Sequence, residues 1–401
     1  MTTNTVAIRP IMAALNFLPG THVRTLCGLT LSLLFAAMSA TMSATIFATP
    51  AHAEVLIGQT SGFTGSVAAS VKETTDGAKL YLDSVNKAGG VHGEKIKLIS
   101  LDDKFDPKLA AENAKTLIVD NNVLALFLTR GTPHNQAIMP LLTEHRVPLI
   151  APSTGAMALH KPVHPWLFNV RATYQREAER AVRHLSLIGI EKIGVVQVDD
   201  SFGADAVVGV MAGFAAVGKT AAFVEKFDRA HPDFKATVAK TQSTSAQAVI
   251  ILGSGQAVVD GVAALRDSGS RVQVVTLSNN ASSGFVASLG KNARGIIVGQ
   301  VFPYERSRNA AIVTEAQTLA SAQGLGDITP AMIEGFAGAK VLVEALRRAG
   351  PHPTRQKLRD TLENMQKVNI GGLEISYSPT DHSGLDFADL SIVGEGNRFV
   401  R

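Results

Sequence analysis

Short apolar runs alternate with longer segments of helical periodicity through most of the chain. Residues 55–59 and 123–128 are two such runs, and continuous apolar runs bounded by turn residues are typical of buried parallel strands. Residues 66–87 carry apolar side chains at helical spacing and end at a Gly-Gly pair, a common helix end. This alternation predicts βαβ units and therefore an α/β fold with doubly wound parallel sheets.

The alternation restarts after Ala172, so the predicted strands divide between two lobes. Residues 192–198 are the first predicted strand of the second lobe. No low-complexity linker separates the halves, which predicts a hinge of several short crossovers. Near the C-terminus, residues 330–348 form a strongly periodic predicted helix. Beyond it, residues 373–377 and 390–393 are expected to pair as an antiparallel ribbon.

The first 53 residues differ in composition from the rest of the chain. They contain Arg9 and Arg24 but no acidic residue, then an apolar run, and they end in Ala51-His52-Ala53. A charged start, an apolar centre and an A-x-A cleavage site predict a secretory signal peptide over residues 1–53, with cleavage before Glu54. Cleavage would remove the single cysteine, so thiol catalysis and cysteine-based metal sites are excluded.

The remaining chain has the composition of a folded protein. Overall, 46% of the residues are hydrophobic and 18% are charged, and the length allows two or three domains. The net charge of +4 comes from scattered lysines and arginines, so a nucleic-acid partner is not expected. No later segment has enough consecutive apolar residues to span a bilayer. The mature protein is expected not to span the membrane.

Two small polar turns follow the predicted strands at 123–128 and 147–151. The first contains Thr132 and His134, and the second is Ser153-Thr154-Gly155. Ligands of open α/β sheets bind beyond the carboxyl ends of the strands, and hydroxyl groups and free N–H groups at helix starts suit an anion. Each turn alone is better explained as an ordinary helix cap. Two turns on consecutive strands favour a binding site for a carboxylate.

Several motifs, in this order and spacing, resemble those of a known protein family. They are residues 61–65 (SGFTG), 85–93 (VNKAGGVHG), 102–103 (DD), 131–133 (GTP), 147–155 (VPLIAPSTG), 168–172 (FNVRA) and 200–203 (DSFG). From residue 54 onward, the chain resembles the periplasmic substrate-binding proteins of ABC importers. The resemblance is to the leucine/isoleucine/valine-binding branch, which has the type I periplasmic binding fold.

The resemblance implies two lobes that close on a ligand and then dock on a membrane permease. Lobe I would comprise residues 54–172 with 302–368 returning to it. Lobe II would comprise residues 173–301 with 369–401 returning to it. The implied protein is a periplasmic monomer and not an enzyme, without cofactor or metal. It would carry an amino acid or another small carboxylate.

The resemblance also implies a ligand site built from both lobes. The two lobe I turns would hold the ligand carboxylate, and Phe63, in the turn after the first predicted strand, would wall the site. Residues of lobe II would cover the ligand. The expected ligand-binding residues are Phe63, Thr132, His134, Ser153, Thr154, Gly155, Tyr174, Phe202, Asn279 and Asn280.

Two positions depart from the pattern of amino-acid binders. Asn279 and Asn280 stand where such proteins often carry an acidic residue for the ligand ammonium, and neutral amides compensate a buried ammonium poorly. His134 stands where a small hydroxyl residue is common, and it could add positive charge. A carboxylate without an ammonium, aliphatic or aromatic, fits at least as well as an amino acid. Asp199, Asp200 or Glu334 could still supply the acid.

Other motifs lack the context that their function requires. Residues 213–220 have the spacing of a phosphate-binding loop, but a predicted helix ends there instead of beginning. Gly253-Ser254-Gly255 follows a strand and opens a helix, yet it lacks the third glycine of a dinucleotide site. The alternatives to a transport receptor are a ligand sensor that docks on a signalling receptor and, less favoured, an exported α/β enzyme.

Overall fold

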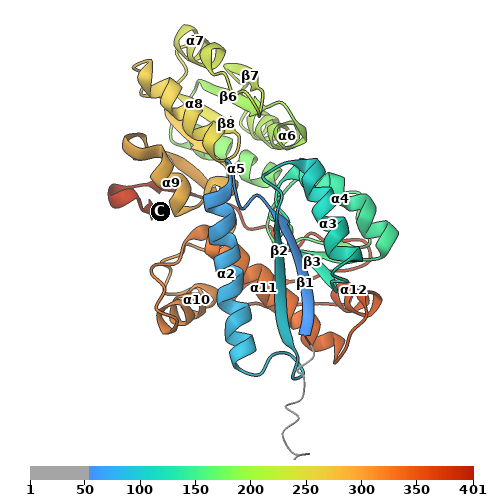
Figure 1. Ribbon diagram of the computed structural model, residues 1–401. Coiled ribbons are helices and arrows are strands. Elements are labelled where there is room, and N and C mark those ends of the chain that lie inside the picture. The colour runs from blue at the N-terminus through green and yellow to red at the C-terminus, as the bar shows by residue number, and fades with distance from the viewer. Residues whose placement is uncertain (1–53) are drawn as a thin grey trace, which may run out of the picture. The chain divides into compact units, whose positions relative to one another are not determined.

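The first sheet is formed by the N-terminal part of the described chain. The computed structural model describes residues 54–401, so the predicted signal peptide lies outside the described residues. Five parallel strands lie in the order β2-β1-β3-β4-β5 (Figure 1). They are β1 (Glu54–Ser61), β2 (Lys95–Asp102), β3 (Ala125–Phe127), β4 (Leu149–Ile150) and β5 (Leu167–Phe168).

The second sheet repeats the same strand order and extends it. Its seven strands lie in the order β14-β13-β10-β9-β8-β6-β7. The five strands β6 to β10 are parallel to one another. They are β6 (Ile193–Val198), β7 (Phe223–Phe227), β8 (Ala248–Leu252), β9 (Gln273–Thr276), β10 (Ile297–Gln300), β13 (Asp389–Val393) and β14 (Phe399–Val400). The predicted α/β fold with two doubly wound parallel sheets is confirmed.

Helices connect the parallel strands and cover the sheets. Figure 1 shows α2 beside α11, and α3 beside α4. The helices before the second sheet are α2 (Ala68–Lys87), α3 (Pro107–Val119), α4 (Thr132–His145) and α5 (Tyr174–Leu187). Those that follow are α6 (Ser201–Ala216), α7 (Lys235–Ser243), α8 (Gln256–Asp267), α9 (Ser283–Leu289), α10 (Ala311–Ala322), α11 (Pro330–Ala349) and α12 (Arg355–Glu363).

Helix α11 is buried along most of its length. The periodic pattern at 330–348 predicted an amphipathic helix, but both flanks of α11 are buried, including Phe336 and Leu342. Close contact with α2 requires glycine on both helices. A Cβ atom at Gly77 would lie 2.0 Å from the carbonyl oxygen of Met332, and one at Gly335 would lie 1.8 Å from that of Thr74. The two backbones therefore pack directly against each other.

The predicted C-terminal ribbon is wrong. Strand β12 (Glu374–Ile375) pairs with β11 (Val368–Asn369), whereas β13 pairs with β10 and β14. Strand β13 instead pairs with β10 over four residue pairs at the edge of the second sheet, and the segment between β12 and β13 packs elsewhere. Within it, Tyr377 donates a hydrogen bond from its hydroxyl to the carbonyl oxygen of Asn169, over 2.6 Å. The tail therefore contacts both sheets in turn.

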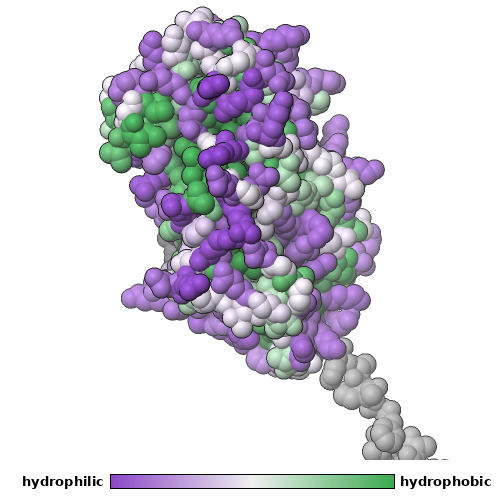
Figure 2. Space-filling view, turned by 90° about the vertical axis from the view of Figure 1, so that its left-hand side faces the viewer, coloured by the Kyte–Doolittle hydropathy of each residue, from purple (hydrophilic) through white to green (hydrophobic). Residues whose placement is uncertain are grey.

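One face of the molecule is mainly polar. Figure 2 shows a mainly polar face with one group of apolar residues towards an upper edge. Among residues 54–401, no helix combines the length and the apolar character that crossing a bilayer would require. Two adjacent large apolar side chains at the end of α5, Leu187 and Ile188, are exposed.

Candidate functional site

The loops that follow the parallel strands converge on one small cavity. Its lining residues come two to six positions after the ends of β2 to β9, and their side chains leave a cavity of only about 10 Å³ between them. The residues that line it are Phe105, Arg130, Gly131, Thr132, Pro133, Ser153, Tyr174, Phe202, Arg229, Ser254 and Asn279. Both sheets therefore present their carboxyl ends to the same space, as binding sites of open α/β sheets do.

The strand order explains why the site forms at this place. In each sheet the chain first adds a strand on one side of its first strand and then continues on the other side. This switch point lies between β1 and β3 in the first sheet and between β6 and β8 in the second. The connections on the two sides of such a switch point diverge and leave a crevice. Arg130 and Thr132 follow β3 at the first switch point, and Phe202 and Ser254 follow β6 and β8 at the second. The cavity thus joins two switch points.

Arg130 is the central cation of the site and connects its two sides. Its Nη2 donates to the carbonyl oxygen of Asn279 over 2.6 Å, and its Nη1 donates to Oγ of Ser153 over 3.3 Å. Only 4% of Arg130 is exposed, and burial lowers the pKa of its guanidinium. Ser153 in turn donates to Oε1 of Glu334 over 2.7 Å. Arg130 thus reaches a carboxylate only through a hydroxyl group.

A buried ion-pair network lies behind the cavity. Arg171 follows β5, and its Nη2 contacts Oε1 of Glu177 at 2.6 Å and Oγ of Ser278 at 2.5 Å. Its Nη1 lies 3.6 Å from Oε1 of Glu334. The guanidinium carbon of Arg171 lies 4.7 Å from the ring centre of Tyr174, which faces the cavity. The network therefore fixes the lining residue Tyr174 from behind.

Aromatic side chains form the apolar walls. Tyr174 and Phe202 meet edge to face with ring centres 4.8 Å apart. On the opposite side, the guanidinium carbon of Arg229 lies 5.2 Å from the ring centre of Phe105. Arg229 also pairs with Oδ2 of Asp200 at 2.5 Å. The cavity therefore combines aromatic walls with one cation, Arg130, that has no direct acidic partner.

The structure brings together half of the residues expected from the sequence. Thr132, Ser153, Tyr174, Phe202 and Asn279 line the cavity. Thr132 and Ser153 lie in the turns after the neighbouring strands β3 and β4. Tyr174 and Phe202 lie at the starts of α5 and α6, and Asn279 lies in the turn after β9. These five positions agree with the expected arrangement of a site formed by both sheets.

The other expected residues do not line the cavity and support its neighbours instead. Oγ1 of Thr154 lies 2.9 Å from Oγ1 of Thr132. At Gly155 a Cβ atom would lie 2.5 Å from the carbonyl oxygen of Ala172, so glycine lets the two loops approach. Asn280 accepts from the N–H of Gly255 over 2.8 Å. Phe63 is half-buried and lies outside the set of lining residues.

His134 does not add the positive charge expected of it. The ring is 1% exposed and stacks on Phe105 with ring centres 4.4 Å apart. Burial lowers the pKa of His134 to about 4, so the imidazole is neutral at pH 7. It supports Phe105 from behind, and the cation of the site is Arg130 instead.

Acidification is expected to destabilise the protein through its buried histidines. Burial lowers the pKa of both His134 and His160 to about 4, below the usual 6.5. Below pH 6.5 the unfolded chain therefore binds protons that the folded chain does not. The free energy of unfolding falls as the pH drops from 6.5 towards 4, by up to about 3 kcal/mol for each histidine.

Melting temperatures of His134→Asn should depend less on pH over this range than those of the wild type. His231→Asn is the matched control, because that side chain is 91% exposed; a wild-type profile in His134→Asn would contradict the assignment.

Six lining residues were not among the expected site residues: Phe105, Arg130, Gly131, Pro133, Arg229 and Ser254. They lie two to six residues after the ends of β2, β3, β7 and β8. That position is the signal that would have identified them. The glycine-rich turn that resembled a dinucleotide site contributes Ser254 to this cavity.

The acidic candidates are all engaged with other groups. Asp199 pairs with Lys226, and Asp200 caps α6 and pairs with Arg229. Glu334 accepts from Ser153 and lies beside Arg171. None of these three carboxylates lines the cavity. The phosphate-loop pattern at 213–220 also lacks its required context, since α6 ends at Ala216 and β7 begins at Phe223.

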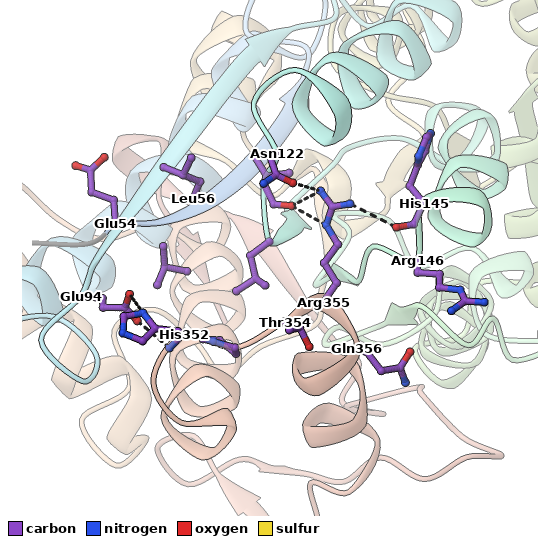
Figure 3. A pocket seen from close by; sticks show the side chains of 14 residues that line it. Glu54, Leu56, Glu94, Asn122, His145, Arg146, His352, Thr354, Arg355 and Gln356 are labelled. Atoms are coloured by element: carbon purple, nitrogen blue, oxygen red, sulfur yellow. Dashed lines mark hydrogen bonds and ion pairs between the residues drawn. The ribbon is translucent and has the colours of Figure 1, made fainter. Parts of the chain in front are cut away.

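A larger cavity lies at the opposite edge of the first sheet, around the amino end of β1. Its volume is about 620 Å³. Figure 3 shows the side chains that line it. Its central side chain, Arg355, donates to the carbonyl oxygens of Ile118 and Val123 over 2.9 and 3.0 Å. Beside it, Nδ1 of His352 lies 2.8 Å from Oε1 of Glu94. Arg355, His352 and Glu94 are therefore engaged with protein groups rather than directed at a ligand.

Comparison with known proteins identifies the family. A profile of the periplasmic binding protein family matches residues 54–386. Leu/Ile/Val-binding protein homolog 3 of Brucella melitensis biotype 1 is 24% identical over 350 residues, which cover 85% of this chain and 92% of the relative. The Leu/Ile/Val-binding protein BraC3 of Rhizobium johnstonii is 25% identical over 355 residues, or 86% of this chain and 93% of the relative.

Solved structures agree with the sequence comparison. A substrate-binding periplasmic protein from Ralstonia solanacearum is 28% identical with a TM-score of 0.79, covering 86% of this chain and 99% of that one. A possible leucine/isoleucine/valine-binding protein from Rhodopirellula baltica SH 1 shares the fold with a TM-score of 0.81 at 24% identity, covering 88% and 98%. Proteins of this family are ligand-binding periplasmic proteins and not enzymes. The chain therefore belongs to the periplasmic binding protein family.

Proposed function

We propose that the protein is the solute-binding receptor of an ABC importer. It captures a small carboxylate between two closing lobes and delivers it to a membrane permease. The observation that carries this proposal is Arg130, a buried cation in the cavity shared by both sheets. The names of the relatives make leucine, isoleucine and valine candidate ligands, together with aliphatic and aromatic acids.

The lobe boundaries expected from the sequence remain part of this proposal, with one change. Lobe I comprises residues 54–172 and 302–368, and lobe II comprises residues 173–301 and the end of the tail. The contacts of Tyr377 with Asn169 and of Leu385 with Val170 support keeping residues 369–385 with lobe I. The last crossover then lies just before β13.

Contacts between the proposed lobes support a closed arrangement. The carboxylate of Glu73 on α2 accepts from the N–H groups of Ser283 and Gly284, over 3.0 and 2.8 Å. The carbonyl oxygen of Ser66 accepts from the N–H of Gln256 over 3.2 Å. The small cavity suits this state, and a ligand gains access when these contacts open. The receptor is proposed to act as a periplasmic monomer after cleavage of residues 1–53.

Replacing Thr132 by valine tests the proposed contact with the ligand carboxylate. A hydrogen bond to a charged group contributes about 1.5–3 kcal/mol, so affinity should fall by about 10- to 100-fold. The probe is the tightest ligand from a thermal-shift screen of residues 54–401, refolded to remove carried-over solute, against amino acids and other small carboxylates. Thr318→Val is the matched control, because Thr318 lies on the exposed face of α10. Equal affinity of both variants would remove Thr132 from the site.

The importer role has a separate test in cells. A strain without this protein should lose uptake of the ligand identified in the screen, and uptake should return with the wild-type chain. A ligand sensor would leave uptake unchanged and would alter a cellular response to the ligand instead. Binding without any effect on uptake would therefore overturn the importer role but leave the ligand-binding function intact.

A further inference from the structure

Two polar groups of the cavity lack the partners that their chemistry requires. Arg130 is 4% exposed, and among residues 54–401 no carboxylate pairs with it directly. Asn279 is also 4% exposed, and its Oδ1 has no hydrogen-bond partner within the described chain. Both residues line the cavity. One is a charged donor and the other is a neutral acceptor.

The orientation of Asn279 follows from its other contacts. Its Nδ2 donates to the carbonyl oxygen of Gly253 and to Oγ of Ser254, each over 3.0 Å. These contacts use both amide hydrogens, so Oδ1 is the atom left without a partner. A buried acceptor without a donor destabilises a protein by about 1–3 kcal/mol, and a ligand donor would relieve this cost. The free acceptor therefore points to a ligand that donates a hydrogen bond.

The unpaired cation identifies the other end of the ligand. A buried charge without a counterion is unfavourable, and a guanidinium binds a carboxylate through two parallel hydrogen bonds. Glu334 is the carboxylate whose charge acts on Arg130, but it already accepts from Ser153 and lies beside Arg171. A ligand carboxylate at Arg130 would provide the missing charge.

The same distribution of charge disfavours a ligand ammonium. An ammonium beside Asn279 would meet a neutral acceptor and the cation Arg130, with no free carboxylate in the lining. A hydroxyl group can donate one hydrogen bond to Oδ1 without a buried positive charge. Because Nη2 of Arg130 donates to the backbone carbonyl oxygen of Asn279 over 2.6 Å, the two residues that would recognise the ligand are in contact. The ligand hydroxyl and carboxylate must therefore be close together.

We infer that the ligand is a small 2-hydroxycarboxylic acid, with its carboxylate on Arg130 and its hydroxyl donating to Oδ1 of Asn279. Phe105, Tyr174 and Phe202 surround the rest of the ligand. The inference rests on the proposed receptor function and specifies its ligand class. It makes Arg130 and Asn279 the residues that select a hydroxy acid over an amino acid.

Isothermal titration with matched acids tests this inference. The first set is 2-hydroxyisocaproate, leucine and isocaproate, and the second is mandelate, phenylglycine and phenylacetate. Within each set only the group beside the carboxylate changes, from hydroxyl to ammonium to hydrogen. In at least one set, the hydroxy acid should bind about 100-fold more tightly than the amino acid and about tenfold more tightly than the unsubstituted acid.

Two variants assign the contacts in the same experiment. Arg130→Gln should weaken binding of every carboxylate by at least about 100-fold, because it removes the counterion of the ligand. Asn279→Ala should weaken the hydroxy acid about tenfold and leave the unsubstituted acid unchanged. Arg183→Gln is the control, since Arg183 is an exposed residue of α5. Circular dichroism of each variant shows whether it is folded, and the wild-type ranking of the matched acids tests the inference independently of the variants.

The outcomes separate the ligand class from the receptor function. Tightest binding by leucine or phenylglycine would overturn the hydroxy-acid inference and leave the receptor function intact. The same holds if another carboxylate binds and Asn279→Ala has no selective effect. If no small carboxylate binds, both proposals fail.

Discussion

Replacing Arg171 by alanine is expected to lower the free energy of unfolding by about 3–5 kcal/mol. Arg171 is 1% exposed and its partner Glu177 is 0% exposed. Without the guanidinium, Glu177 keeps hydrogen bonds from the N–H and hydroxyl of Ser278, at 2.8 and 2.9 Å, but loses its buried cation. Burial already raises the pKa of Glu177. The midpoint of urea unfolding measures the loss.

A double replacement separates the cost of an unpaired charge from the value of the ion pair. In Arg171→Met with Glu177→Leu, both charges are absent, and apolar replacement of a buried pair is often neutral. Most of the stability should therefore return. Arg183→Ala is the exposed control and should change stability by less than about 1 kcal/mol. A loss below about 1 kcal/mol in Arg171→Ala would show that the network does not stabilise the fold.

Replacing Gly335 by alanine is expected to cost about 3 kcal/mol of stability. The added methyl group would lie 1.8 Å from the carbonyl oxygen of Thr74, so α2 and α11 would have to separate. A backbone atom cannot move away by changing a rotamer. Glu334 directly precedes Gly335 and would shift with α11 away from Ser153, so ligand affinity should fall as well. Thermal melting and ligand titration measure the two effects.

Gly326→Ala is the matched control for this substitution. A Cβ atom there would meet nothing within 4 Å, and the backbone conformation is open to other residues. Its stability should equal or slightly exceed that of the wild type, because alanine restricts the unfolded chain. Equal melting temperatures for Gly335→Ala and Gly326→Ala would contradict the close packing of α2 against α11.

Part of the site was accessible from the sequence because its signal is local. Thr132 and Ser153 are small polar residues directly after apolar strand runs, and parallel strands place such turns at one edge of a sheet. Arg130 belongs to the same turn but resembles any solvated arginine in the sequence. Its burial depends on Asn279, which lies 149 positions further along the chain. His134 was misread for the same reason, because its neutral state results from packing on Phe105.

The sequence by itself determined the α/β class, the alternation of strands and helices, and the two turns that carry hydroxyl groups. Periodicity and turn chemistry act over a few neighbouring residues, so they are visible in one chain. Only the tertiary structure decided the strand partners of the tail and the charge of the cavity. Short strands such as β11 and β12 pair according to which edge is free, and a side chain's charge depends on its burial. Both follow from contacts between residues that are distant in the sequence.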